Sequence, residues 1–224
     1  MLTMDYIVKI LSIAPVTHDV KRFRIEKPEG YTFIPGQATD VSINTEALKE
    51  EKRPFTFTCL AEDTYLEFTI KGYADHHGIT DKLHHLQPGD ELIVRDVWGA
   101  IEYKGPGYFI AGGAGITPFL AILRWLHKEN KLDGNTLLFS NKKSEDVICE
   151  KELAGMLGSN AKFILTRETK AGYLKGPVDE AFLKQHIKDF KQHFYICGPD
   201  AMTAAINDTL TKLGASTDAV VFEK

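Results

Sequence analysis

The spacing of hydrophobic residues changes near residue 105, and this change indicates a fold in two parts. Before it, six short segments rich in Val, Ile, Thr, Phe and Tyr are separated by turn signals such as Pro35-Gly36 and Pro88-Gly89-Asp90. Short strands at this spacing are typical of a small antiparallel barrel or sandwich. The expected strands cover residues 5–14, 20–27, 37–44, 53–60, 65–73 and 90–99.

After residue 105, strand-like and helix-like segments alternate. This alternation predicts an α/β doubly wound parallel sheet with helices on both faces. Lys104-Gly105-Pro106-Gly107 is the natural linker, so we expect one domain over 1–104 and a second over 105–224. The expected strands cover 107–113, 135–141, 161–168, 193–198 and 218–224, and the expected helices 117–130, 144–157, 178–187 and 200–214.

Composition excludes several classes of protein. The net charge of −4 gives no electrostatic support for binding nucleic acid. No apolar run approaches the roughly 18 residues of a membrane-spanning helix. The first residues do not read as a signal peptide, and the three cysteines are scattered along the chain, which together predict a cytoplasmic location.

A glycine cluster joins the first strand and the first helix of the second half, in the stretch YFIAGGAGITPFLAIL over residues 108–123. Gly113, Ala114 and Gly115 would let an anion approach backbone N–H groups at a helix start. Pro118 suits the first turn of that helix, and Thr117 offers a hydroxyl either to cap it or to bind a phosphate. The alternative is a glycine turn that only allows close packing of strand and helix.

Three motifs in order resemble those of the ferredoxin–NADP reductase family of flavoproteins, in its short bacterial form without a built-in iron–sulfur domain. The family's Arg-x-Tyr-Ser/Thr motif reads Arg53-Pro54-Phe55-Thr56, its Gly-x-Gly-x-x-Pro motif spans Gly113–Pro118, and its Cys-Gly-Pro motif is Cys197-Gly198-Pro199. The resemblance implies an N-terminal antiparallel β-barrel that binds FAD, with FMN as the alternative. It also implies a C-terminal NAD(P)-binding α/β domain.

The resemblance gives the first motif its roles on the flavin. Arg53 would hold the flavin phosphate, which suits a guanidinium fork. Phe55 would stack on the ring in place of the usual tyrosine, and Thr56 would contact the edge of the ring where hydride arrives. The alternatives are an exposed arginine, an inward-facing core phenylalanine and an ordinary strand threonine.

A second stretch resembles the family's other flavin-binding segment. Lys71 and Tyr73 would lie beside the flavin, and Gly78, Ile79 and Thr80 would bind its phosphates at a helix start. The alternative for Thr80 is a helix N-cap without a ligand. The histidines of this region do not fall at metal-site spacing, so we expect no metal. They are His76, His77, His84 and His85.

Cys197 ends a strand at the carboxyl edge of the expected parallel sheet, where ligands bind. By resemblance it would lie near the nicotinamide C4 and set the distance for hydride transfer; the alternative is a small core residue. Thr166 and Arg167 match the family's contact to the 2′-phosphate of NADPH and favour NADPH slightly. Other members of the family carry a further arginine at the position of Pro177, so this chain departs from the pattern there. A surface ion pair is the alternative for Arg167.

The resemblance implies an enzyme that passes electrons from NAD(P)H through the flavin to a separate carrier such as flavodoxin or ferredoxin. The chain carries no Cys-x4-Cys-x2-Cys cluster of its own. Two alternatives stay open. The first is the reductase component of an oxygenase, or a reductase of free flavin or quinone, and the second is a non-catalytic flavin- or nucleotide-binding module. Many relatives end on an aromatic residue that shields the flavin, whereas here Phe222 is followed by Glu223 and Lys224.

Overall fold

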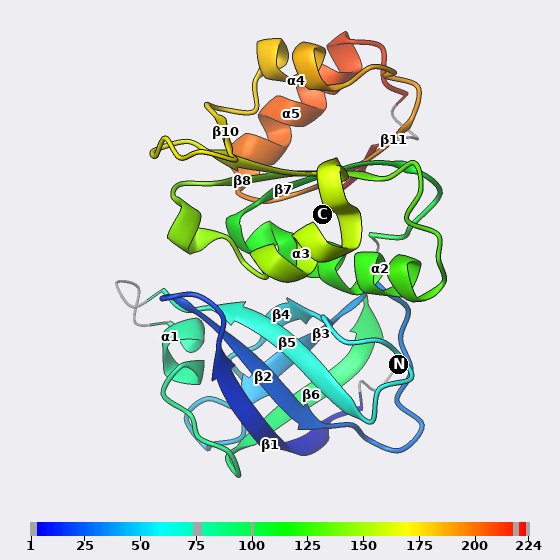
Figure 1. Ribbon diagram of the computed structural model, residues 1–224. Helices are drawn as coiled ribbons and strands as arrows, with labels where there is room; N and C mark the ends of the chain where they lie inside the picture. Colours follow the sequence, from blue (N-terminus) through cyan, green and yellow to red (C-terminus); the bar gives the residue numbers. More distant parts are fainter. Residues whose placement is uncertain (1–3, 74–77, 100, 217–219, 223–224) are drawn as a thin grey trace.

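The computed structural model describes residues 4–73, 78–99, 101–216 and 220–222. Two sheets divide them (Figure 1). The first is antiparallel, runs in the order β4-β3-β6-β1-β2-β5 and curls into a barrel-like unit. Its strands are β1 (Tyr6–Pro15), β2 (Val20–Glu26), β3 (Ala38–Ile43), β4 (Arg53–Thr56), β5 (Tyr65–Lys71) and β6 (Glu91–Trp98), with the short helix α1 (Ile79–Leu83) beside them.

The second sheet is parallel throughout, in the order β10-β9-β8-β7-β11-β12. Its strands are β7 (Gly107–Gly112), β8 (Thr136–Asn141), β9 (Ala161–Leu165), β10 (Leu174–Lys175), β11 (His193–Cys197) and β12 (Val220–Phe222). Helices α2 (Thr117–Lys128) and α3 (Glu150–Leu157) cover the face toward the barrel. Helices α4 (Glu180–His186) and α5 (Asp200–Lys212) cover the other face (Figure 1). The predicted fold class is confirmed in both halves.

Local structure differs from expectation at a few places. β10 was not predicted, because two residues carry no periodic pattern. The helix expected over 144–157 begins with a 3₁₀ turn at Ser144–Asp146, and α3 starts only at Glu150. His76 and His77 lie outside the described residues, and so does the end of the chain after Phe222.

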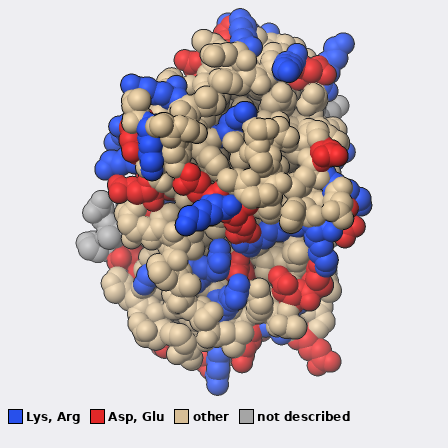
Figure 2. All heavy atoms as spheres, viewed as in Figure 1, with Lys and Arg blue, Asp and Glu red and all other residues tan. Residues whose placement is uncertain are grey.

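Three hydrophobic clusters form the core. One fills the barrel, one lies between the parallel sheet and helices α2 and α3, and one lies under α4 and α5. The cluster at α2 and α3 also contains Val20 and Ile101 from the first half of the chain. The two halves therefore share apolar packing, and acidic and basic side chains mix along the middle of the molecule where they meet (Figure 2).

Candidate cofactor-binding cleft

A cavity of about 950 Å³ opens at the carboxyl ends of β7, β8, β9 and β11, where parallel sheets bind ligands. The barrel contributes Asp19, Lys71 and Tyr73 to its wall, so both halves of the chain form it. The second half contributes Gly112, Gly113, Ala114, Gly115, Thr117, Ser140, Asn141, Lys142, Asp146, Thr166, Cys197, Gly198, Pro199 and Met202. We call it the larger cavity.

The glycine cluster has two physical functions in this wall. Gly113 has a φ of +53°, and a Cβ there would meet no atom within 4 Å, so its backbone faces open space. At Gly115 a Cβ would lie 2.3 Å from the carbonyl oxygen of Cys197, so only glycine allows this close packing. The loop therefore serves packing at one glycine and leaves the other accessible to a ligand.

The helix after this loop begins as the sequence predicted, with Pro118 in the first turn of α2. The N-cap is Ile116 and lacks a side-chain cap, so a capping function for Thr117 is excluded. Thr117 instead lines the larger cavity beside the glycines.

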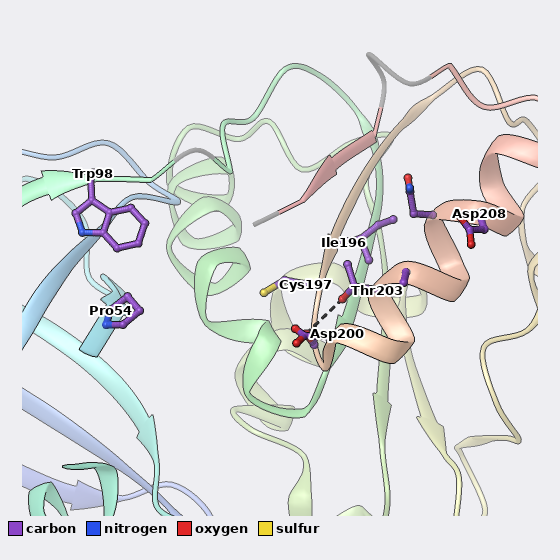
Figure 3. Close-up of a pocket in the computed structure, with 10 residues that line it drawn as sticks. Pro54, Trp98, Ile196, Cys197, Asp200, Thr203 and Asp208 are labelled. Atoms are coloured by element: carbon purple, nitrogen blue, oxygen red, sulfur yellow. Dashed lines mark hydrogen bonds between the residues drawn. The ribbon is translucent and has the colours of Figure 1, made fainter. Parts of the chain in front are cut away.

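A second cavity of about 630 Å³, the smaller cavity, lies between the barrel and α5. Pro54 and Trp98 line it from the barrel, facing Cys197 and the start of α5 (Figure 3). Thr203 of α5 donates a hydrogen bond from Oγ1 to the carbonyl of Gly198 at 3.3 Å. Cys197 and Gly198 line both cavities, so the two adjoin at the carboxyl end of β11.

The first motif spreads its residues over both faces of β4. Thr56 is 8% exposed and lies on the same side of β4 as Pro54, which lines the smaller cavity. We call this the cleft-facing side of the strand. Phe55 points to the other side and packs against the barrel core, with its ring centroid 6.2 Å from that of Phe68. Arg53 is exposed, donates to the carbonyl of Lys52 at 2.7 Å and is not among the residues that line either cavity. The predicted flavin contacts of Arg53, Phe55 and Thr56 stay predictions.

The second flavin stretch reaches the larger cavity through Lys71 and Tyr73. Lys71 Nζ lies 2.8 Å from Asp19 Oδ2 and 5.9 Å from the ring centroid of Tyr73. Burial alone would raise the pKa of Asp19, but the hydrogen bonds from Lys71 and Thr17 outweigh it, so the pKa is lowered. An ionised carboxylate therefore neutralises part of the charge of Lys71.

The start of α1 differs from the capping alternative. Gly78 occupies the N-cap, with no side-chain cap, so Thr80 does not cap this helix. Ile79 is 1% exposed and packs in the barrel core, which leaves only its backbone for a ligand. Phosphate binding by Gly78, Ile79 and Thr80 stays a prediction.

The residues expected at the nucleotide's adenosine end come together at the cavity edge. Thr166 lines the larger cavity, and its Oγ1 donates to the carbonyl of Asn141 at 3.2 Å. The exposed Arg167 donates its backbone N–H to the carbonyl of Lys142 at 2.9 Å. Two basic residues therefore lie at the neighbouring ends of β8 and β9.

Sequence reasoning missed several residues that line the two cavities, among them Asp19, Asn141 and Trp98. Asn141 is 5% exposed, and neither its Nδ2 nor its Oδ1 has a hydrogen-bond partner within the described part of the chain. Trp98 is 40% exposed, although tryptophan usually packs against other side chains. Two signals in the sequence could have found two of them. Asn141 is a polar residue at the carboxyl end of an expected parallel strand, and Trp98 is an aromatic residue directly before Gly99 at the end of β6.

The wall fits the two implied cofactors. A buried amide with unused hydrogen-bonding groups and an open glycine backbone suit a dinucleotide. Exposed aromatic faces at Trp98 and Tyr73 suit a planar ring. Among the residues that the structure describes, no group of His, Cys, Asp or Glu is arranged to hold a metal ion. In the same residues no helix is both long and apolar enough to cross a membrane.

Comparison with known proteins gives a consistent result. The model of the oxidoreductase NAD-binding domain matches residues 109–208. The ferredoxin–NAD(P)+ reductase component of the naphthalene 1,2-dioxygenase/salicylate 5-hydroxylase systems of Ralstonia sp is 25% identical over 214 residues, 92% of this chain and 64% of that protein. NADH-cytochrome b5 reductase 2 of Mycosarcoma maydis is 26% identical over 219 residues, 87% of this chain and 62% of its own. The chain thus spans a little under two thirds of the length of these relatives.

Solved structures share the fold along the whole chain. A ferredoxin NADP+ reductase from Neisseria gonorrhoeae with bound FAD and NADP superposes with a TM-score of 0.87 at 22% identity, covering 98% of each chain. The FAD/NAD-binding domain of a nitric oxide dioxygenase from Vibrio cholerae gives a TM-score of 0.86 at 21% identity and covers 97% of each chain.

Proposed function

Because the chain belongs to the ferredoxin reductase-like family of FAD- and NAD(P)-binding flavoproteins, we propose that it oxidises NAD(P)H and passes the electrons to a separate carrier. One observation carries the proposal: Cys197 and Gly198 line both cavities, at the place where the barrel faces the parallel sheet. A ring held on the barrel side would there meet a ring held at the carboxyl end of β11.

The protein's own contribution is binding and orientation. When bound, a flavin supplies the chemistry that accepts a hydride and releases electrons singly. On the sheet side, the open backbone at Gly113, the start of α2 and Thr117 offer hydrogen-bond donors to a pyrophosphate. Cys197 fixes how closely a nicotinamide approaches the barrel.

On the barrel side, Thr56 is assigned to the edge of the flavin ring, because it lies on the same face of β4 as Pro54, which lines the smaller cavity. Lys71, Tyr73 and the backbone of Gly78 to Thr80 are assigned to the flavin's ribityl and phosphate groups. Arg53 is assigned to a flavin phosphate, for which its exposed guanidinium must turn from the Lys52 carbonyl. FAD is proposed rather than FMN because members of the family more commonly use FAD.

NADPH is the preferred donor in this proposal. Lys142 and Thr166 line the larger cavity, and Arg167 follows Thr166 and is joined to Lys142 through a backbone hydrogen bond, so two cations are available for a 2′-phosphate. Replacing Arg167 with Ala should lower kcat/KM for NADPH about tenfold or more and leave NADH little changed. Lys184→Ala, on α4 at the opposite face of the sheet, is the matched control. An equal loss with both donors would contradict the assignment.

Flavodoxin or ferredoxin is the proposed acceptor, since the relative from Ralstonia is named as a ferredoxin–NAD(P)+ reductase component. The second candidate is a reductase component of an oxygenase, favoured by relatives named for naphthalene dioxygenase and propane 2-monooxygenase systems. Steady-state turnover with each carrier, with free flavin and with quinone separates these candidates.

The decisive experiment mixes FAD-loaded protein with NADPH or NADH in a stopped-flow instrument without oxygen. Bleaching of the flavin absorbance within seconds is the expected result. A protein that holds FAD but is not reduced by either donor would be a binding module, and a protein that takes up neither FAD nor FMN would remove the proposal altogether.

A further inference from the structure

The barrel turns one row of side chains toward the cleft. Ala38 of β3 pairs with Thr56 of β4 on one side and with Trp98 of β6 on the other. Residues directly opposite each other in antiparallel strands lie on the same side of a sheet, so these three share a face. Pro54, two residues before Thr56, also lies on it. Because Pro54 and Trp98 line the smaller cavity, this face is the barrel wall of the cleft.

The aromatic ring of the first motif lies on the opposite face. Phe55 pairs with Thr39, which is fully buried, and packs against the barrel core, where its ring contacts Phe68. Its ring therefore contacts the interior of the barrel. An aromatic contact on the cleft side has to come from another residue.

Trp98 has the exposure and position for that contact. Among the described residues only two aromatic side chains rank as exposed, Trp98 at 40% and Tyr73 at 45%, and each lines one cavity of the cleft. Figure 3 shows the indole of Trp98 and the ring of Pro54 on one side of the smaller cavity, with the sulfur of Cys197 turned toward them from the other. An indole exposed beside a cavity gains contact area when a planar ligand covers it.

Resting on the proposed function, we propose that Trp98 is a flavin-binding residue, whose indole stacks on the flavin ring in the smaller cavity with Pro54 beside it. The stacked ring then has its other face toward Cys197, which leaves that side for the nicotinamide. Trp98 thus supplies the aromatic surface that the position of Phe55 does not provide.

The affinity of the apoprotein for FAD tests this contact. Trp98→Ala should weaken FAD binding about tenfold, within the range found for ring stacking on an aromatic side chain. Trp98→Phe should stay within about threefold of wild type, because a smaller aromatic face remains. Trp125→Ala is the matched control: this second tryptophan of the chain lies on α2 against Tyr103, does not line either cavity, and should not affect FAD binding.

The fluorescence of bound flavin gives an independent readout, since an indole in contact quenches it. Trp98→Ala and Trp98→Leu should hold brighter FAD than wild type, and Trp125→Ala should not. The leucine variant keeps an apolar side chain, so it decides the matter if the alanine variant folds poorly. Wild-type affinity and unchanged flavin fluorescence in the Trp98 variants would overturn the inference while the reductase function stands. A wild-type protein without FAD affinity would remove both.

Discussion

Arg124 of α2 reaches across the boundary between the two halves and donates a hydrogen bond from Nη1 to Oε1 of Glu67 in β5, at 2.9 Å. Glu67 is only 2% exposed, and Arg24 Nε binds its second oxygen at 3.0 Å. Arg124 also binds Glu152 of α3 through Nε and Nη2, at 2.6 and 3.0 Å. This cluster of charges therefore joins the barrel to the helices that cover the parallel sheet.

Replacing Arg124 with Ala should lower the free energy of unfolding by about 2–4 kcal/mol, because it leaves a buried carboxylate with fewer partners. Urea unfolding monitored by circular dichroism measures the loss. Lys128→Ala is the matched control, because Lys128 lies on the same helix as Arg124 but forms only an exposed ion pair, with Glu62 of the barrel. This variant should have little effect on stability. Equal stability of the Arg124 variant and wild type would mean that the cluster does not stabilise the fold.

Stability should also fall in acid through Glu67. Burial alone would raise its pKa, but Arg124, Arg24 and Arg22 outweigh burial, and the pKa is lowered from the usual 4.5. A carboxyl with a lowered pKa in the folded state stabilises above its unfolded pKa, and this contribution disappears as the pH falls through the folded value. Unfolding midpoints should therefore drop below about pH 4.5, and Glu67→Gln should flatten this dependence. An identical pH profile in the variant would assign the acid sensitivity to other groups.

Most of the fold could be predicted from the sequence, because each long strand or helix shows the hydrophobic periodicity of its type. The burial of Glu67 could not be predicted, since alternation in β5 puts Leu66, Phe68 and Ile70 inside the barrel and Glu67 outside. The docking of α2 brings Arg124 onto that outer face, and this contact depends on a residue almost sixty positions later in the chain. β10 escaped prediction for the simpler reason that a two-residue strand has no period.

The candidate site was predicted where a motif gives both residue type and local geometry. Gly113, Gly115 and Cys197 meet at the cleft because a strand end and a helix start fix them. Trp98 and Asp19 were missed because their position depends on strand register and on how the halves pack, neither of which a motif records. Phe55 and Pro54 are neighbours in sequence, but strand alternation puts them on opposite faces of β4, and the motif alone does not say which face meets the cavity.

Arg53→Ala should weaken FAD retention about tenfold or more without loss of stability, because the side chain is exposed and a charge-assisted phosphate contact is lost. Flavin content after dialysis and the thermal midpoint of the apoprotein measure the two effects. Lys52→Ala changes the neighbouring exposed cation and should keep its flavin. Wild-type flavin content in the Arg53 variant would remove its assigned role.

Cys197→Ala should slow flavin reduction by NAD(P)H more than it weakens binding of the dinucleotide, because the thiol sets the approach of one ring to the other. Single-turnover kinetics over a range of donor concentrations separates the limiting rate from the dissociation constant. Cys59→Ala, in the barrel core at 2% exposure, should lower stability and leave that rate intact. An unaltered limiting rate in the Cys197 variant would show that this residue only packs.

Gly113 and Gly115, which are separated in the loop only by Ala114, should respond differently to replacement by alanine. Gly113→Ala adds a methyl group into open space at a φ of +53°, so the protein should fold with a penalty of about 1 kcal/mol and bind NAD(P)H at least tenfold more weakly. Gly115→Ala puts its Cβ 2.3 Å from the Cys197 carbonyl, so the loop must shift and stability should fall further. Thermal unfolding and dinucleotide titration of both variants measure this contrast. If Gly113→Ala bound the dinucleotide as wild type does, the open backbone there would not be its phosphate site.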